Sequence, residues 1–172
     1  MKCHILYYGI LLGSLISIHA CREKPQQQLN TPVQAANTHK PEYDSLAALK
    51  YGADDYGMKK YVMAFLKKGP NRSTDSLEAM KLQTAHLENI MRMAEEGKLV
   101  LAGPFFGEGD IRGVYIFNVP SIEEAEALTN TDPAIAAGSL VMELKEWYGP
   151  AGLMAVNRIN KSLTRRSILK NN

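Results

Sequence analysis

The spacing of apolar side chains changes repeatedly along the middle of this 172-residue chain, and these changes predict a fold. Residues 60–66 are apolar on both alternating faces, which is the pattern of a strand buried on both sides. From residue 75 to residue 96, apolar side chains recur at helical spacing and charged ones gather opposite them. We therefore expect a strand and then a long amphipathic helix, capped by Ser73 or Thr74 and stopped by Gly97.

The residues that follow predict two more strands, another helix and a final strand. Residues 99–105 and 112–119 have the pattern of strands joined by a turn. Ser121 and Glu124 occupy the positions of a capping box at the start of a second helix. Residues 140–147 alternate as a fourth strand. The order β-α-β-β-α-β predicts an α+β ferredoxin-like plait whose helices cover one face of the sheet.

The other face of the predicted sheet has no helix to cover it. In the fourth strand, this face carries one of two alternating sets: Val141, Glu143, Lys145 and Trp147, or Met142, Leu144 and Glu146. Both sets are too apolar for free exposure to water. We therefore expect the face to be buried against the sheet of a second copy, so that the protein forms a homodimer.

The N-terminus has the pattern of a bacterial secretion signal. Lys2 precedes an apolar run over residues 5–18, which is too short for a membrane-spanning helix of roughly 20 residues but suits a signal peptide. Residues 18–21, Ile-His-Ala-Cys, resemble a lipobox, so we expect a signal peptide over 1–20 and a lipid on Cys21. The alternative is an ordinary secreted protein or a retained anchor in which Cys21 carries no lipid.

The residues after the signal predict a location. Residues 21–50 comprise the lipidated cysteine and a polar, proline-bearing stretch without apolar period, which we expect to be a flexible tether. Arg22 stands where an aspartate is associated with inner-membrane retention, and this favours the outer membrane. We therefore expect a lipid-anchored protein of the bacterial cell envelope, with its domain in the periplasm or at the cell surface.

The distribution of charge argues against nucleic acid as a partner. The chain has 20 basic and 18 acidic side chains, but six of the basic ones are Lys2 or lie within residues 157–172, which contain no acid. Residues 3–156 therefore carry a formal charge of −4, whereas phosphate binding requires a clustered basic face. We expect a basic C-terminal tail over 151–172, in which residues 157–172 either lie against anionic lipid headgroups or form a solvated and partly frayed terminus.

The residues that commonly bind metals and cofactors are sparse. Both cysteines, Cys3 and Cys21, lie in the first 21 residues, so no disulfide, zinc knuckle or iron–sulfur site is expected downstream. His86 is the only histidine of the predicted domain, whereas zinc and iron require three or four ligands. The chain also has no glycine-rich phosphate loop. We expect no metal and no cofactor.

Several short motifs occur in an order that resembles a known family. They are His86-Leu87, Glu96-Gly97-Lys98-Leu99-Val100-Leu101-Ala102-Gly103-Pro104, Ser121-Ile122-Glu123-Glu124-Ala125, Asp132-Pro133, Ala137-Gly138 and Trp147. Together they resemble the YCII-related (YciI-like) domain family, within an expected domain over residues 57–150. The resemblance implies a plait that pairs as a dimeric α+β barrel, members mostly of unknown function, and a proposed active-site pair that maps to His86 and Asp132.

The chain departs from this family pattern at two positions. Gln83 stands where many members carry an arginine, and the small Ala134 follows Asp132-Pro133 in place of a larger residue. Both changes bear on an anion-binding or substrate-shaping role.

His86 is the first candidate site residue because it falls between Leu82 and Ile90 on the apolar side of the predicted helix and so points inward. A carboxylate on one ring nitrogen would let the imidazole act as acid or base, and Asp132 is the carboxylate that the resemblance pairs with it. The alternative is that His86 is a hydrogen-bonded core residue and Asp132 only caps the turn after Pro133.

Three further residues are candidates for substrate binding. Gly103 and Pro104 end the second predicted strand, where glycine either lets a ligand approach the backbone or permits a bulge and turn. Arg112 would supply charge for an acidic ligand.

These candidate residues and the resemblance leave two functions open. One is cofactor-independent acid–base catalysis on a small organic molecule, by analogy with lactone isomerases and dehalogenases among related dimeric barrels. The other is a non-catalytic module that binds a small ligand or a protein partner.

Overall fold

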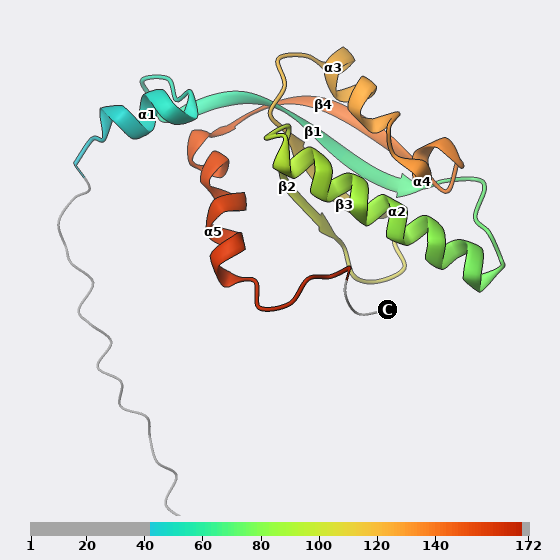
Figure 1. The fold of residues 1–172 in the computed structure, drawn as a ribbon. Coiled ribbons are helices and arrows are strands. Elements are labelled where there is room, and N and C mark those ends of the chain that lie inside the picture. The colour runs from blue at the N-terminus through green and yellow to red at the C-terminus, as the bar shows by residue number, and fades with distance from the viewer. Residues whose placement is uncertain (1–41, 170–172) are drawn as a thin grey trace, which may run out of the picture. The chain divides into compact units, whose positions relative to one another are not determined.

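Four antiparallel strands form one sheet in the order β2-β3-β1-β4 (Figure 1). The strands of this computed structural model are β1 (Met58–Lys68), β2 (Leu99–Pro104), β3 (Ile111–Phe117) and β4 (Leu140–Pro150). The structure describes residues 42–169, so the predicted signal peptide, Cys21 and most of the predicted tether lie outside the described residues. Strand β1 is central and pairs with both β3 and β4, in agreement with its apolar pattern.

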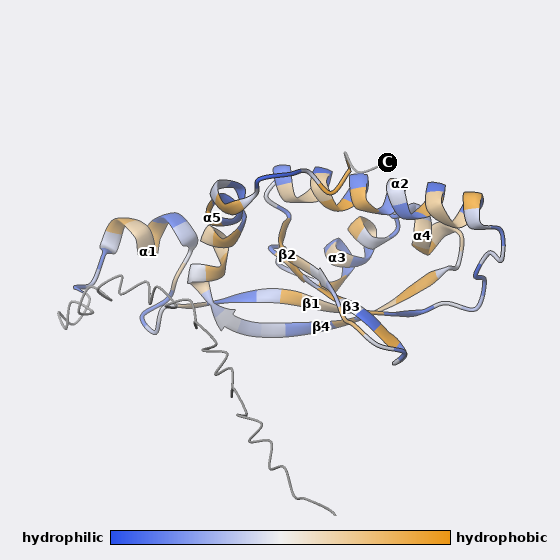
Figure 2. Cartoon of the chain, turned by 90° about the horizontal axis from the view of Figure 1, so that it is seen from below, coloured by the Kyte–Doolittle hydropathy of each residue, from blue (hydrophilic) through white to orange (hydrophobic). Residues whose placement is uncertain are grey.

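Helices cover one face of this sheet. The helical segments are α1 (Ser45–Tyr51), α2 (Ser76–Glu95), α3 (Ile122–Thr129), α4 (Pro133–Ala136), the 3-10 helix η1 (Ala151–Ala155) and α5 (Val156–Leu163). Figure 2 shows α2, α3 and α4 on the same side of the sheet. The order β1-α2-β2-β3-α3-β4 and the sheet order are those of a ferredoxin-like plait, so the predicted α+β fold class is confirmed.

The main hydrophobic core lies between the sheet and these helices. Its buried members are Val62, Ala64, Leu66, Met93, Leu99, Tyr115, Phe117, Val119 and Ala125. Leu140, Met142 and Leu144 of β4 pack against this cluster. Because side chains alternate along a strand, the opposite face carries the first of the two predicted sets, Val141, Glu143, Lys145 and Trp147. Trp147 packs there against a second cluster of Tyr61, Val100 and Ile116.

The N-cap of α2 differs from the prediction. Asp75, and not Ser73 or Thr74, accepts hydrogen bonds from two backbone N–H groups of the first turn. The Ser73 hydroxyl instead accepts a hydrogen bond from the Asp75 N–H at 3.1 Å. Serine, threonine and aspartate all cap helices well, so their order in the sequence does not decide among them.

Residues 45–51 form helix α1, although the sequence analysis assigned residues 21–50 to a flexible tether. The Asp44 carboxylate accepts a hydrogen bond from the Ala47 N–H at 2.9 Å, and Gly52, with a φ of 67°, ends the helix. The helix contacts η1 but buries none of its residues. The tether prediction is therefore wrong for this segment. The helix is held by its two caps and by its contact with η1, and neither of these produces an apolar period that the sequence could reveal.

The predicted basic tail over 151–172 begins inside the fold. Ala151 is buried, and its N–H donates to the carbonyl oxygen of Gly57 at 2.9 Å. The Asn157 side-chain amide donates to the carbonyl oxygen of Leu99 at 2.7 Å and ties α5 to β2. The interpretation as a frayed terminus is therefore wrong for residues 157–163.

Residues from Glu42 onward form one compact unit with its own core. A chain that begins at Glu42 therefore keeps every described element and is a suitable object for solution experiments. Among the helices of residues 42–169, none has the length and apolar character needed to cross a membrane.

Candidate active site

A histidine from α2 meets an aspartate at the start of α4. His86 Nδ1 lies 2.7 Å from Asp132 Oδ2, a hydrogen-bonding distance, although 46 residues separate the two in the chain. Both side chains are buried, with 7% of His86 and 0% of Asp132 exposed. The structure thus brings together the two residues that the sequence analysis paired, and their catalytic role stays a prediction.

Asp132 is held by α4 as well as by the histidine. Its Oδ1 accepts a hydrogen bond from the Ala134 N–H at 2.9 Å, which makes Asp132 the N-cap of α4. Its backbone is extended, as expected for a residue before proline. The carboxylate therefore fills both roles that the sequence analysis treated as alternatives, since one oxygen caps the helix and the other bonds the imidazole.

Tyr115 of β3 lies on the other side of the imidazole. Its hydroxyl oxygen is 3.3 Å from His86 Nε2, and the two rings stack with their centroids 6.3 Å apart. Burial, and secondly the negative charge of Asp132, raise the pKa of Tyr115. The phenol therefore keeps its proton, which it can donate to an unprotonated Nε2. With the Nδ1–H donated to Asp132, these contacts favour one neutral tautomer of His86.

Asn89 connects the same face of α2 to the loop before α4. Its Oδ1 accepts hydrogen bonds from Arg92 Nη2 at 2.8 Å and from the Thr131 hydroxyl at 3.1 Å. Its Nδ2 is buried and has no hydrogen-bond partner within residues 42–169. These bonds fix the approach of the loop to α2, and the next residue of that loop is Asp132.

Sequence reasoning did not place Tyr115 or Asn89 at this site. The sequence offers only the positions of these two residues as evidence that they belong to the site. Asn89 follows His86 by three residues on one helix face, and Tyr115 alternates with apolar residues of a strand. Such positions are common in cores and do not single out a contact. The groups now seen together, an imidazole, a carboxylate and a phenol, are ones that move protons in enzymes.

Across the described part of the chain, no group of three or more His, Cys, Asp or Glu side chains is placed to hold a metal ion.

A small cavity of about 90 Å³ lies beside the elements that hold the pair. It is lined by Arg72, Ser73, Ala79, Leu82, Gln83, Ala134, Ser139 and Leu140. Gln83 and Ala134, the two positions that the sequence analysis contrasted with the family pattern, both line this cavity. Neither His86 nor Asp132 lines it. The pair is therefore closed to this cavity in the present conformation, although Gln83 is one helical turn from His86.

The structure does not bring the other predicted substrate-binding residues to the imidazole. Arg112 lies on the face of β3 opposite to Tyr115, because side chains alternate along a strand. Its guanidinium donates to the carbonyl oxygen of Gly107 at 2.9 Å and so braces the β2–β3 turn. Gly103 and Pro104 end β2 beside this turn, and a Cβ at Gly103 would meet no atom within 4 Å. These residues shape the hairpin and do not join the His86 site.

The YCII-related domain model matches residues 60–148, which are more than half of the chain and contain all the site residues described above. The chain belongs to the YCII-related domain family. The match runs from β1 into β4, and α1, η1 and α5 lie outside it.

Two known proteins are similar to this chain. Uncharacterized protein YjpA of Bacillus subtilis (strain 168) is 36% identical over 62 residues, which are 36% of this chain and 71% of that protein. A solved structure of 5-chloro-2-hydroxyhydroquinone dehydrochlorinase (TftG) from Burkholderia phenoliruptrix AC1100, in complex with 2,5-dihydroxybenzoquinone, has 21% sequence identity and a TM-score of 0.39. That match covers 50% of this chain and 92% of the dehydrochlorinase chain. The likeness to the dehydrochlorinase is too low to bear on the activity of this protein.

Proposed function

We propose that the YCII-related domain is a cofactor-independent acid–base catalyst that acts on a small organic molecule through His86 and Asp132. The observation that carries the proposal is the 2.7 Å contact between His86 Nδ1 and Asp132 Oδ2. A carboxylate on one nitrogen orients an imidazole and stabilises the cation that forms when the other nitrogen accepts a proton. The Ala134 N–H fixes Asp132 in turn, so this orientation exists before a substrate binds.

In the proposed reaction, His86 Nε2 removes a proton from the substrate while Asp132 keeps the Nδ1–H and balances the charge of the imidazolium. Nε2 then returns the proton to a different atom of the substrate, so the enzyme ends with the protons it began with. The Tyr115 hydroxyl now occupies Nε2 through a long contact of 3.3 Å. It either gives way to the substrate or passes the proton between substrate and Nε2.

The small cavity is the proposed route to the imidazole. Its volume of about 90 Å³ is well below the roughly 300 Å³ or more of typical ligand pockets. A substrate must therefore displace a lining side chain, and Gln83 is the long, flexible one closest in sequence to His86. This step is part of the proposal, because the imidazole is buried in the present conformation.

Nitrogen NMR of the imidazole tests the proposed orientation. In a ¹⁵N-histidine-labelled chain beginning at Glu42, His86 is the only histidine, so its two ring signals are unambiguous. At a pH where the ring is neutral, we expect the proton on Nδ1 and none on Nε2. Asp132→Asn should move the proton to Nε2, because an amide N–H now faces Nδ1. A wild-type ring with its proton on Nε2 would overturn the proposal, since that nitrogen could not accept a proton.

A non-catalytic ligand-binding or interaction module is the second candidate function. The observation that favours it is that both ring nitrogens of His86 and both oxygens of Asp132 have hydrogen-bond partners and are buried. Such a network stabilises a fold without any reaction. This candidate predicts that His86→Asn lowers stability and leaves ligand or partner binding unchanged once the variant is folded.

A homodimer is the proposed assembly. Val141 on the sheet face away from α2 is exposed, and Met63, Phe65 and Val114 of the same face are only partly buried. A face of this kind on an isolated protein is unfavourable in water, and a second copy of the sheet would cover it.

We also propose that the protein is an envelope lipoprotein anchored through Cys21. The support is the lipobox-like sequence at 18–21, which lies outside the described residues. Expression in a bacterial host with a labelled fatty acid should label wild type and Cys3→Ser, and Cys21→Ser should lose the label. Labelling of Cys21→Ser would contradict the anchor, and Cys3→Ser serves as the matched control because it removes the chain's other thiol.

A further inference from the structure

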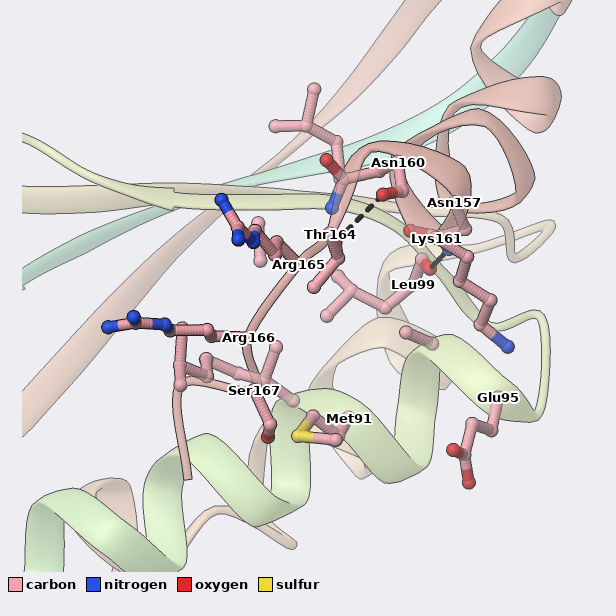
Figure 3. Close-up of a pocket in the computed structure, with 15 residues that line it drawn as sticks. Met91, Glu95, Leu99, Asn157, Asn160, Lys161, Thr164, Arg165, Arg166 and Ser167 are labelled. Carbon is pink, nitrogen blue, oxygen red and sulfur yellow. Dashed lines mark hydrogen bonds between the residues drawn. The ribbon is translucent and has the colours of Figure 1, made fainter. Parts of the chain in front are cut away.

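A cavity of about 470 Å³ lies between α2, β2 and the C-terminal segment (Figure 3). Its floor is apolar and consists of Ile90, Met91, Ala94, Leu99, Leu101 and Ala102. The volume falls in the range of about 300–1,000 Å³ that is typical of small-molecule sites. Neither His86 nor Asp132 lines it, so this cavity is distinct from the proposed acid–base pair.

The C-terminal segment forms the wall of this cavity. After α5 ends at Leu163, residues 164–168 all contribute to the lining. Two hydrogen bonds seen in Figure 3 hold the base of this wall: Asn157 Nδ2 donates to the Leu99 carbonyl, and the Thr164 hydroxyl donates to the Asn160 carbonyl. The wall lies outside the residues that the family model matches, whereas the floor lies within them.

The rim of the cavity is positively charged. Lys161, Arg165 and Arg166 line it, against a single carboxylate, Glu95. Figure 3 shows Lys161 and Glu95 at one end and the two arginines at the other. No ion pair joins any of these three cations to a carboxylate of residues 42–169. The two neighbouring arginines therefore leave an uncompensated positive charge at the edge of an apolar floor.

We propose that this cavity binds an amphipathic anion, a single acyl chain that ends in a carboxylate or phosphate group. The apolar floor removes the chain from water, and Arg165 and Arg166 bind the head group, for which guanidinium is well suited. Each methylene buried on the floor strengthens binding about threefold to fourfold. An apolar pocket with a few charged groups that converge at one end is the usual construction of such sites.

Calorimetric titration of the chain that begins at Glu42 tests the proposal with dodecanoate as the probe. We expect one dodecanoate per chain and progressively weaker binding of decanoate and octanoate. Dodecylamine, which has the same chain length and the opposite charge, should not bind. Tighter binding of dodecyl phosphate than of dodecanoate would assign the head group as a phosphate, and the reverse order would assign it as a carboxylate.

Two kinds of variant locate the ligand. Replacing Arg165 and Arg166 together by glutamine should weaken dodecanoate binding about tenfold. The matched control replaces Arg158 and Lys60 by glutamine, because both are exposed, lie outside the lining and carry the same total charge. Ala94→Phe should abolish binding without any change of charge, since Ala94 is a partly buried residue of the floor and the larger side chain fills the space of the acyl chain.

Three results would overturn the proposal. One is no binding of dodecanoate to the folded chain at millimolar concentration. Another is equal loss of affinity in the arginine pair and in its control, which would mean attraction by net charge alone. The third is unchanged binding in Ala94→Phe, which would place the acyl chain elsewhere. Circular dichroism of each variant checks that the fold is retained.

Discussion

Asp132 bonds two partners with its two carboxylate oxygens. Oδ1 caps α4 through the Ala134 N–H, and Oδ2 bonds His86 Nδ1. The stability of the loop and the orientation of the imidazole therefore depend on one side chain. Because the two oxygens serve different partners, substitutions can separate the two roles.

Replacing Asp132 tests this separation. Asp132→Ala loses the cap and the bond to the buried histidine, so we expect a loss of about 2–4 kcal/mol in the free energy of unfolding. Asp132→Asn keeps an oxygen for the cap and should lose less than half as much. Urea unfolding measures both variants, and equal losses would show that the cap contributes nothing separate.

Tyr115 gives a prediction about alkaline pH. Its pKa lies above the ordinary value of 10.0, because burial and the charge of Asp132 disfavour the phenolate. Above pH 10 the unfolded chain therefore loses a proton that the folded chain retains, so the protein is destabilised as pH rises. We expect the free energy of unfolding of wild type to fall more steeply than that of Tyr115→Phe, by about 1.4 kcal/mol per pH unit. Denaturant unfolding at pH values on both sides of 10 compares the slopes, and parallel slopes would contradict a buried, neutral phenol.

The helices and strands show which features of the fold the sequence reveals. The central strand was predicted over 60–66 because both of its faces are apolar, and it extends to Met58–Lys68 because β4 pairs with it along eleven residues. Helix α2 was found from its 3.6-residue period. Helix α1 was missed, since it buries no side chain and depends on its caps and on η1.

The residue that caps a helix is harder to predict than the helix itself. Substitutions at the start of α2 test which residue is its cap. Asp75→Ala should lower the free energy of unfolding by about 1 kcal/mol, because two N–H groups lose their acceptor. Ser73→Ala is the matched control, and we expect a smaller loss because Ser73 accepts one backbone bond outside the helix and donates one to the exposed Glu78 carboxylate. Thermal unfolding of the two variants compares them. A larger loss for Ser73→Ala would restore the capping role that the sequence analysis gave to it.

The candidate site was only partly predictable for a similar reason. The helical period placed His86 inward, and the family resemblance supplied Asp132. The contact of His86 with Tyr115 joins a helix to a strand 29 residues away, and it depends on how α2 sits on the sheet. Local spacing carries no information on that packing. The same holds for Arg112, which strand alternation turns to the opposite face.

At the scale of the whole molecule, the uncovered sheet face predicts the oligomeric state. We expect the chain that begins at Glu42 to be a dimer at micromolar concentration by light scattering. Phe65→Lys should give a monomer, because it places a charge in the middle of that face. Tyr56→Lys is the control, since Tyr56 is an exposed aromatic residue outside the sheet. A monomeric wild type, or dissociation by both variants, would contradict pairing through the sheet.

The proposed function requires that His86 is an acid–base group that a small molecule can reach, and carbethoxylation by diethyl pyrocarbonate tests this most directly. His86 is the only histidine from Glu42 onward, so mass spectrometry can assign the product. We predict that folded wild type reacts, that Tyr115→Phe reacts faster because Nε2 is freed, and that Asp132→Asn reacts more slowly because Nε2 is protonated. A folded protein that stays unmodified, while the urea-unfolded chain reacts readily, would show that the pair is a sealed part of the core.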